Sequence, residues 1–339
     1  IIMCKSKKFL QIYGRDFVGK TVYLVFFFVK QPTDACFLHR HAYGFFYKKA
    51  TTSFKLAVVV VTLQCLKGRR GNAGIFRIQN MKKQIKDYVV RSNERLSDSY
   101  SLLKLQPADG SAIIDTCAGQ FVEVEVSDSK STFLRRPISI NFVDRDRNEL
   151  WLLVRVAGEG TRHLVALAEG RVLSLVLPLG KGFSIPADTV SKVLLAGGGV
   201  GVAPMLYLGS ELKKRGFEVA FLLGARSKGD LLELEEFEKI GCVYVSTDDG
   251  SMGEHGLITK NSALQKSWQM LYCCGPMPMM KAMAAYAMRN NIECEVSLEN
   301  RMACGVGACL CCVEDTVEGN LCVCKEGPVF NIKRLKWQI

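Results

Sequence analysis

The sequence predicts a multidomain α+β protein that combines an antiparallel β-barrel, a Rossmann-like α/β domain and a small C-terminal lobe. Short segments of alternating apolar and polar residues, separated by turn residues, run from about 85 to 186 and indicate the barrel. From Val190 to about 291 apolar strands alternate with amphipathic helices, which favours an open parallel sheet. The remainder is short and rich in Gly and Cys, so it needs a metal or a neighbouring domain for stability. We therefore expect domains at 81–188, 189–292 and 293–339, after an atypical segment at 1–80.

The first 80 residues differ from the rest of the chain. They hold 14 of the 45 Lys and Arg residues and only two acids, Asp16 and Asp34, so they carry the whole formal charge of +12. They also hold 10 of the 18 Phe residues, and their apolar runs are 9 and 11 residues long, too short for a membrane span of about 20. We expect this segment to be disordered or foreign to the native protein. The alternative is a basic arm for a membrane or a nucleic acid, but the neutral main body predicts neither partner.

A glycine-rich turn, "AGGGVGVAP", follows an apolar strand and opens a helix. Its glycines allow close approach of a pyrophosphate, and the helix start offers free N–H groups, so we expect nucleotide binding there. The alternative is a tight turn without a ligand. Later, "YCCGPMPMM" ends another strand at the edge of the sheet where ligands bind, and Cys274 is a candidate for a place near a nicotinamide ring; a buried structural cysteine is the alternative. The candidate nicotinamide-binding residues are Gly198, Gly199, Gly201, Pro204, Gly275 and Pro276.

The barrel region contains "RRPISI" and "LLVRVAGEGT". Arg136 and Arg155 are suited to pair with a diphosphate, Ser139 to hydrogen-bond a flavin ring, and Gly160 and Thr161 to supply N–H donors. From these residues alone, a strand with solvated arginines is the better interpretation.

Six of the 14 cysteines lie within 21 residues near the C-terminus, next to glycines. This arrangement is typical of metal binding in a reducing cytoplasm rather than of a disulfide framework. Cys304, Cys309 and Cys312 have the C-x4-C-x2-C spacing of plant-type [2Fe–2S] sites, and Cys324 follows after 11 residues. The alternative is a zinc site that pairs Cys309 and Cys312 with Cys322 and Cys324. We favour the cluster, with ligands Cys304, Cys309, Cys312 and Cys324, because the zinc site leaves Cys304 unused.

Taken in order, "RRPIS", "LVRVAGEGT", "GGGVGVAP", "CGPMPMM" and "SLENRMACGVGACLCC…VCKEGPVF" resemble the ferredoxin reductase-type flavoproteins. More narrowly, the chain is similar to the electron-transfer subunits of class 1B dihydroorotate dehydrogenases over about 85–333. The resemblance implies FAD in the barrel, NAD(H) on the α/β domain and a [2Fe–2S] cluster in the C-terminal lobe. It places the FAD contacts at Arg136, Pro137, Ile138, Ser139, Leu153, Val154, Arg155, Gly160 and Thr161.

The resemblance also implies a cytoplasmic electron-transfer subunit for pyrimidine (UMP) biosynthesis. The partner is an FMN-containing catalytic subunit, two of each in a heterotetramer, and the isolated chain is a diaphorase. A sister subunit of an NADH-dependent ferredoxin:NADP oxidoreductase or a sulfide dehydrogenase is the alternative, although those loops carry Asp where Cys304 stands. A zinc-stabilised binding module without redox activity is the alternative from another class.

Overall fold

The structure is a computed structural model that describes residues 9–15, 21–28, 56–60, 82–127, 129 and 131–338. The chain divides into two compact units, Ile1–Arg77 and Ile78–Ile339. The described part of the first unit is an antiparallel sheet of β1 (Phe9–Arg15), β2 (Thr21–Phe28) and β3 (Leu56–Val60). The expectation of a disordered or foreign segment at 1–80 concerns mostly residues that lie outside the described ones.

The second unit begins with the predicted antiparallel barrel, which closes in the order β4-β5-β8-β7-β6-β9. Inward-facing side chains such as Leu105, Leu150 and Leu175 are fully buried, as the alternating pattern requires. A short helix, α1 (Glu159–Val165), lies between β8 and β9, the last two barrel strands along the chain. The barrel strands are β4 (Gln84–Arg95), β5 (Tyr100–Pro107), β6 (Phe121–Val124), β7 (Arg136–Asp144), β8 (Glu149–Arg155) and β9 (Val172–Leu179).

The predicted α/β domain follows as a seven-stranded sheet in the order β13-β12-β11-β10-β14-β15-β18. All neighbouring pairs are parallel except β15 and β18. The strands are β10 (Lys192–Gly198), β11 (Glu218–Ala225), β12 (Cys242–Thr247), β13 (Glu254–His255), β14 (Met270–Cys274), β15 (Glu293–Ser297) and β18 (Val329–Asn331).

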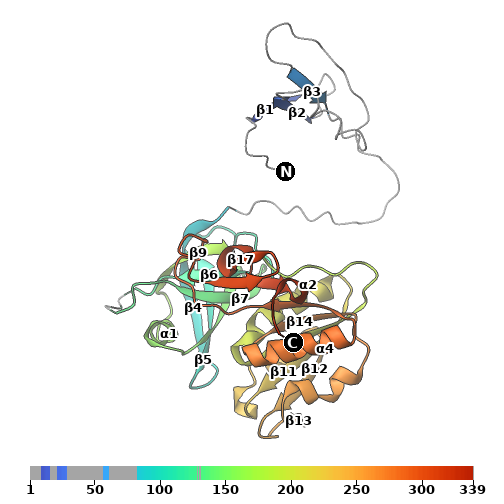
Figure 1. The fold of residues 1–339 in the computed structure, drawn as a ribbon. Helices are drawn as coiled ribbons and strands as arrows, with labels where there is room; N and C mark the ends of the chain where they lie inside the picture. Colours follow the sequence, from blue (N-terminus) through green and yellow to red (C-terminus); the bar gives the residue numbers. More distant parts are fainter. Residues whose placement is uncertain are drawn as a thin grey trace. The chain divides into compact units, whose positions relative to one another are not determined.

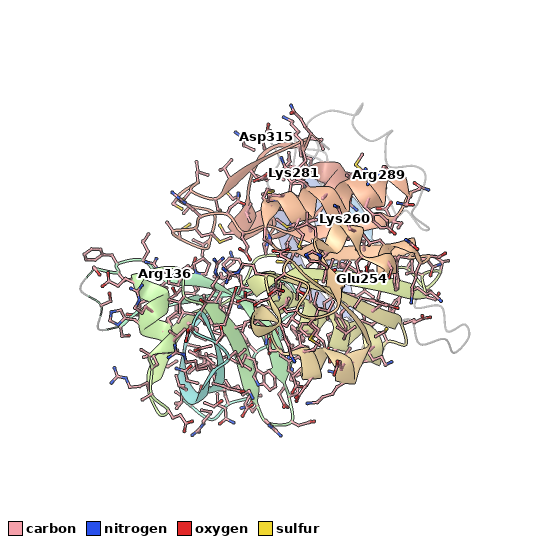
Figure 2. The ribbon with its side chains drawn as sticks, turned by 90° about the horizontal axis from the view of Figure 1, so that it is seen from below. Arg136, Glu254, Lys260, Lys281, Arg289 and Asp315 are labelled. Atoms are coloured by element: carbon pink, nitrogen blue, oxygen red, sulfur yellow. The ribbon has the colours of Figure 1, made fainter. Side chains whose placement is uncertain are left out.

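Helices cover both faces of this sheet. Val193 and Leu195 of β10 pack with α2 (Ala203–Lys214) and α3 (Leu234–Ile240), whereas Leu194 and Ala196 pack with α4 (Met277–Arg289). Lys281 and Arg289 mark α4 in Figure 2. Short 3-10 turns complete the domain at Gly199–Val202 (η2), Lys228–Asp230 (η3), Ile258–Lys260 (η4), Ser262–Gln265 (η5) and Ile332–Arg334 (η6). None of the helices in the described residues is long and apolar enough to cross a membrane.

The cysteine-rich C-terminal segment is anchored to the other two domains. It forms a hairpin of β16 (Val313–Thr316) and β17 (Gly319–Cys322), then α5 (Val323–Glu326). Its last strand, β18, pairs with β15, so the expected boundary at 292/293 separates β14 from two strands of the same sheet. A bridge between Lys181 and Pro328 ties the segment to the barrel end, where it appears in red near β6 and β9 (Figure 1). The neighbouring domains therefore supply the support that so small a lobe needs.

Helix α2 packs the α/β domain against the barrel. The Tyr207 hydroxyl donates a 3.1 Å hydrogen bond to the Thr116 carbonyl, and its ring lies 6.2 Å from that of Phe142 on β7. In a second contact between the two domains, the Asn141 amide donates a hydrogen bond to Glu233 Oε1 at 2.8 Å. These contacts bring the carboxyl edge of the sheet close to β7, the strand that carries the "RRPIS" motif.

Candidate functional site

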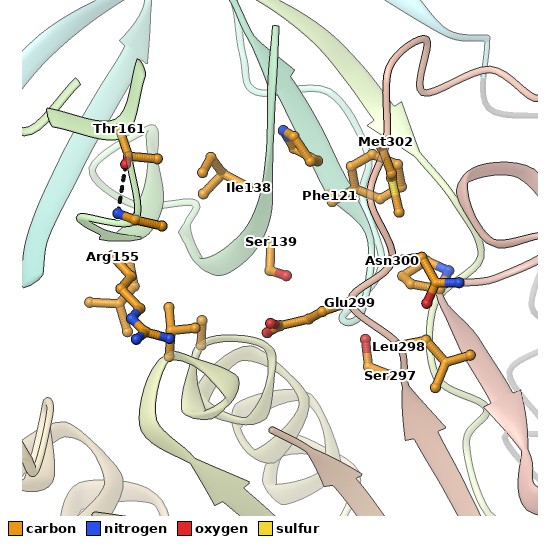
Figure 3. Close-up of a pocket in the computed structure, with 16 residues that line it drawn as sticks. Phe121, Ile138, Ser139, Arg155, Thr161, Ser297, Leu298, Glu299, Asn300 and Met302 are labelled. Carbon is orange, nitrogen blue, oxygen red and sulfur yellow. Dashed lines mark hydrogen bonds between the residues drawn. The ribbon is translucent and has the colours of Figure 1, made fainter. Parts of the chain in front are cut away.

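A pocket lies where the barrel, the α/β domain and the C-terminal segment meet (Figure 3). The barrel contributes residues of β6, β7 and β8, the α/β domain contributes the start of α2, and the segment after β15 contributes a third wall. Of the predicted flavin residues, Pro137, Ile138, Ser139, Leu153, Arg155 and Thr161 line it. Val154 points instead into the barrel core, because neighbouring strand residues face opposite sides.

The two arginines of "RRPIS" have different surroundings. The guanidinium of Arg135 donates to the Ser174 carbonyl at 2.6 Å and to the Glu125 carboxylate at 2.7 Å. Arg135 precedes β7, Ser174 lies on β9 and Glu125 follows β6, so these bonds connect three neighbouring parts of the barrel. Among the described residues, the guanidinium of Arg136 makes one hydrogen bond, a long one of 3.4 Å to the Arg135 carbonyl. Its Nε lies 2.6 Å from the position that a Cβ at Gly160 would occupy, so the missing side chain at the start of α1 makes room for it. Of the two arginines predicted to pair with a diphosphate, Arg155 lines the pocket, whereas Arg136 and Gly160 lie outside its lining.

Thr161 shapes the loop in front of α1. Its hydroxyl oxygen accepts the backbone N–H of Ala157 at 2.8 Å and that of Gly158 at 3.1 Å, the former drawn in Figure 3. Because both donors are held by one side chain, the turn between β8 and α1 keeps a fixed curve along the pocket wall.

Sequence reasoning missed Glu299, which lies in the pocket with its carboxylate toward Ser139 (Figure 3). Burial raises the pKa of this carboxyl, and the nearby Arg155 lowers it in part. Asn300 and Met302 line the same wall. A signal was present, because Glu299 follows β15, and the carboxyl ends of parallel strands share one edge of the sheet.

The two glycine-containing turns of the α/β domain pack directly against each other. A Cβ at Gly201 would lie 2.5 Å from the Cys274 carbonyl oxygen, so only glycine allows this approach of η2 to the end of β14. Gly199 has a φ of +55° and faces the Tyr100 hydroxyl. Of the other predicted nicotinamide residues, Gly198 and Gly275 pack on Met279, Pro204 is buried in the first turn of α2, and Pro276 precedes α4.

Cys274 is buried, with 2% of its surface exposed, and does not belong to the pocket lining. Burial raises the pKa of its thiol well above the ordinary value, and a hydrogen bond with Ser297 lowers it in part. Ser297, its neighbour across the β14–β15 pair, does line the pocket. The structure thus places Cys274 one side chain behind the pocket wall.

The loop from Cys304 to Cys312 wraps its backbone around a sulfur atom. Cys304 Sγ accepts the N–H groups of Val306, Ala308 and Cys309 at 3.5, 3.3 and 3.4 Å. Desolvation raises the pKa of the Cys304 thiol, but these N–H groups and a hydrogen bond with the Cys309 side chain together outweigh it and lower the pKa to about 6. The curl depends on left-handed backbone at Gly305 and Gly307, with φ of +64° and +85°.

The other two candidate ligands are Cys312, at the end of this loop, and Cys324. The N–H of Cys324, on α5, points at Cys312 Sγ at 3.3 Å, and both residues are buried. Cysteine thiolates hold iron–sulfur clusters, and backbone N–H groups directed at their sulfur atoms tune the cluster's potential, so the donor set fits a cluster. Among the described residues no group of three His, Cys, Asp or Glu side chains is already drawn together as a metal site. Cys311 is exposed, and Cys322 is half-buried at the end of β17.

Glu123 is a second residue that the sequence did not reveal. It is buried on β6, and neither carboxylate oxygen has a hydrogen-bond partner among the described residues. Burial, and then the nearby Cys304, raises its pKa to about 7. A Cβ at Gly305 would lie 2.7 Å from Glu123 Cγ, so the cluster loop and the barrel are in direct contact here.

Two family models match this chain. Residues 299–336 match the iron–sulfur cluster binding domain of dihydroorotate dehydrogenase B, and residues 195–285 match the oxidoreductase NAD-binding domain. A relative in Shouchella clausii is 38% identical over 259 residues, which cover 74% of this chain and 97% of the relative. One in Fusobacterium nucleatum is 35% identical and covers 73% and 96%. Both are dihydroorotate dehydrogenase B (NAD+) electron transfer subunits.

The chain belongs to this family. The resemblance in its motifs is therefore confirmed, and so is the predicted architecture of barrel, NAD-binding domain and iron–sulfur lobe. The structure of an NADH-dependent reduced ferredoxin-NADP oxidoreductase is similar with a TM-score of 0.66 and 26% identity, covering 74% of this chain and 90% of that one. The FAD/NAD-binding domain of a nitric oxide dioxygenase from Vibrio cholerae, at 23% identity and a TM-score of 0.52, shares the fold. The sister oxidoreductase is thus a structural neighbour, whereas the two relatives from Shouchella clausii and Fusobacterium nucleatum are dihydroorotate dehydrogenase B subunits.

Proposed function

We propose that this chain carries electrons between NAD(H) and a catalytic subunit that converts dihydroorotate to orotate in pyrimidine biosynthesis. The observation that carries the proposal is the shared pocket, because the barrel motif, the start of α2 and the segment leading to the cysteine loop form its three walls. FAD, NAD(H) and a [2Fe–2S] cluster are the cofactors of the chain. A flavin exchanges electrons in pairs with a nicotinamide and singly with a cluster, which is why it belongs between them.

Different residues are assigned to different parts of FAD. We assign the diphosphate of FAD to Arg136 and to the turn at Gly160 and Thr161, and the flavin ring to the wall at Ile138, Ser139 and Leu153. Val154 supports this wall from the core, and Arg155 and Glu299 face each other across the pocket.

The nicotinamide and the cluster are assigned to the remaining motifs. The turns at Gly198–Gly201 and Gly275–Pro276 hold NAD(H), and Cys274 positions Ser297 at the pocket wall through their hydrogen bond. Cys304, Cys309, Cys312 and Cys324 hold the cluster, with the loop N–H groups directed at its sulfur ligands.

The family name implies a catalytic partner subunit, and we propose that it contains FMN and that two copies of each chain assemble. The cluster loop is suited to face that partner, because Cys309, Leu310 and Cys311 are exposed side by side. Electrons can then leave the chain at its surface rather than through the barrel.

The proposal is tested with the purified chain and with the chain reconstituted with an FMN-containing catalytic subunit. Alone, the chain should reduce an artificial acceptor with NADH and should not oxidise dihydroorotate. Reconstitution should give dihydroorotate-dependent reduction of NAD+. Oxidation of dihydroorotate by the chain alone, or the absence of NAD+ reduction in the complex, would contradict the proposal.

A further inference from the structure

Arg226 occupies a position that selects between nicotinamide dinucleotides. It follows directly after β11, the second strand of the NAD-binding domain. In Rossmann-type domains the residues at this strand end lie near the adenosine ribose, where an acid accepts the 2′-hydroxyl of NAD and an arginine accommodates the 2′-phosphate of NADP. From its position alone, Arg226 would favour NADP.

The guanidinium of Arg226 is already paired. Its Nε lies 3.1 Å from Asp230 Oδ2, and its Nη2 lies 3.3 Å from Asp230 Oδ1, so both carboxylate oxygens are engaged. Asp230 ends η3 and is the less exposed partner, with 20% of its side chain accessible against 76% for Arg226. The two-point contact therefore holds Arg226 against its own loop.

A second acid approaches Arg226 from the next strand. Asp248 follows β12, and its N–H donates to the carbonyl of Ala225 at 3.1 Å, while the N–H of Asp249 donates to the carbonyl of Arg226 at 3.2 Å. These bonds hold the two strand ends together and leave the Asp248 side chain exposed beside Arg226. The Asp249 carboxylate is occupied by Ser251, whose hydroxyl in turn accepts the N–H of Lys228 at 2.7 Å.

We propose that Asp230, which binds Arg226, and Asp248, which interacts with it electrostatically, make this domain select NAD(H) over NADP(H). Asp230 withholds the guanidinium that a 2′-phosphate needs, and Asp248 places a negative charge where that phosphate would lie. A ribose hydroxyl carries no charge and can donate a hydrogen bond to either carboxylate. The exposed Lys228 on the same loop does not reverse this balance, because Arg226 and Lys228 bring two positive charges to these two strand ends, whereas Asp230, Asp248 and Asp249 bring three negative ones. This inference rests on the NAD(H) site of the proposed function.

The test measures the dissociation constants of NAD+ and NADP+ for the cofactor-loaded chain by titration calorimetry. Asp230→Asn, Asp248→Asn and the double variant are compared with wild type and with Glu238→Gln, which removes a charge from an exposed site on α3. We expect the double variant to bind NADP+ at least tenfold more tightly relative to NAD+ than wild type does. Each single variant should show part of that change. The control should leave the ratio within twofold.

Adding Arg226→Ala to the double variant should remove most of the gain, because the released guanidinium provides the phosphate contact. Four results would each overturn the inference. The ratio of the NAD+ and NADP+ dissociation constants could stay unchanged in the double variant, or change equally in Glu238→Gln. The gain in NADP+ binding could survive the loss of Arg226, or wild type could bind both nucleotides equally. Failure of the proposed function has a different signature. In that case NAD+ binds with the expected preference, but reconstitution with the catalytic subunit gives no dihydroorotate-dependent reduction.

Discussion

The cluster loop takes three of its four candidate ligands from nine consecutive residues, whereas the flavin pocket is lined by β6, β7, β8, the start of α2 and the segment after β15. In the loop, backbone N–H groups within five residues of Cys304 surround its sulfur. In the pocket, Ser139 and Glu299 face one another although 159 intervening residues separate them. Cluster binding by the loop should therefore be lost when one residue of the loop changes. The shape of the pocket should instead depend on the contacts that hold the domains together.

The largest effect is expected from Cys309→Ser. This change removes a candidate ligand from the centre of the loop, so we expect complete loss of the cluster's visible absorption and of electron transfer to the catalytic subunit. Because the pocket is built from other segments, reduction of an artificial acceptor by NADH should persist. Cys311→Ser is the matched control and should leave the spectrum unchanged, because Cys311 lies outside the C-x4-C-x2-C spacing that assigns the ligands. A bleached Cys311→Ser protein would show that the assignment of ligands is wrong.

The next effect concerns Glu233, which helps to hold the α/β domain against the barrel. Its Oε1 accepts the amide of Asn141, while Glu233 Oε2 and Asn141 Oδ1 lack hydrogen-bond partners among the described residues. Burial raises the pKa of this carboxyl from the ordinary 4.5 to about 7; the Asn141 bond and Lys104 oppose the rise, whereas Glu236 and Glu94 add to it. Between these two pH values the folded protein keeps a proton that the unfolded chain has released.

The sign of the pH dependence follows from that difference. The contribution of Glu233 to stability is fully present below pH 4.5 and is lost as the pH rises through about 7, where a buried charge forms. Glu233→Gln removes the titration and should raise the free energy of unfolding at pH 8 by about 3 kcal/mol, measured by urea denaturation between pH 5 and 8. Glu235→Gln, an exposed neighbour on α3, should keep the wild-type slope. Parallel slopes in wild type and Glu233→Gln would contradict this explanation.

The third effect concerns the neighbouring residues Arg135 and Arg136, which separate flavin binding from barrel stability. Arg136→Ala should weaken FAD binding by about 2 kcal/mol, or roughly thirtyfold, because a charge-assisted contact to the diphosphate is lost. The melting temperature of the FAD-free protein should not change. Arg135→Ala is the control with the opposite profile, since Arg135 bonds Ser174 and Glu125 within the barrel. It should lower the melting temperature and change FAD affinity less than Arg136→Ala does.

The same contrast explains how much the sequence could predict. The cysteine spacing, the glycine-rich turn and the alternating barrel strands are local patterns, and the architecture they predicted is the observed one. Glu299 and Glu123 escaped notice because each is a common acid whose importance arises only when distant strands meet. The pairing of β18 with β15 was missed for the same reason, since a three-residue strand has no recognisable period. The buried position of Cys274 depends on Ser297 across the sheet, which sequence position alone does not show.

The smallest expected effect concerns the outer surface of the cluster loop. Leu310 is 64% exposed at the tip of the loop and holds a φ of +58°, so an apolar side chain is displayed there at some backbone cost. If the catalytic subunit covers this tip, Leu310→Ala should weaken its binding by about 1 kcal/mol, or roughly fivefold, through lost apolar burial. Leu257→Ala is the matched control, because Leu257 is 60% exposed on the α/β domain before η4. The dissociation constant for the catalytic subunit should change in Leu310→Ala and not in Leu257→Ala. Both variants should keep the visible spectrum of the cluster. An equal loss in the two variants would show that general surface hydrophobicity, rather than the cluster loop, governs assembly.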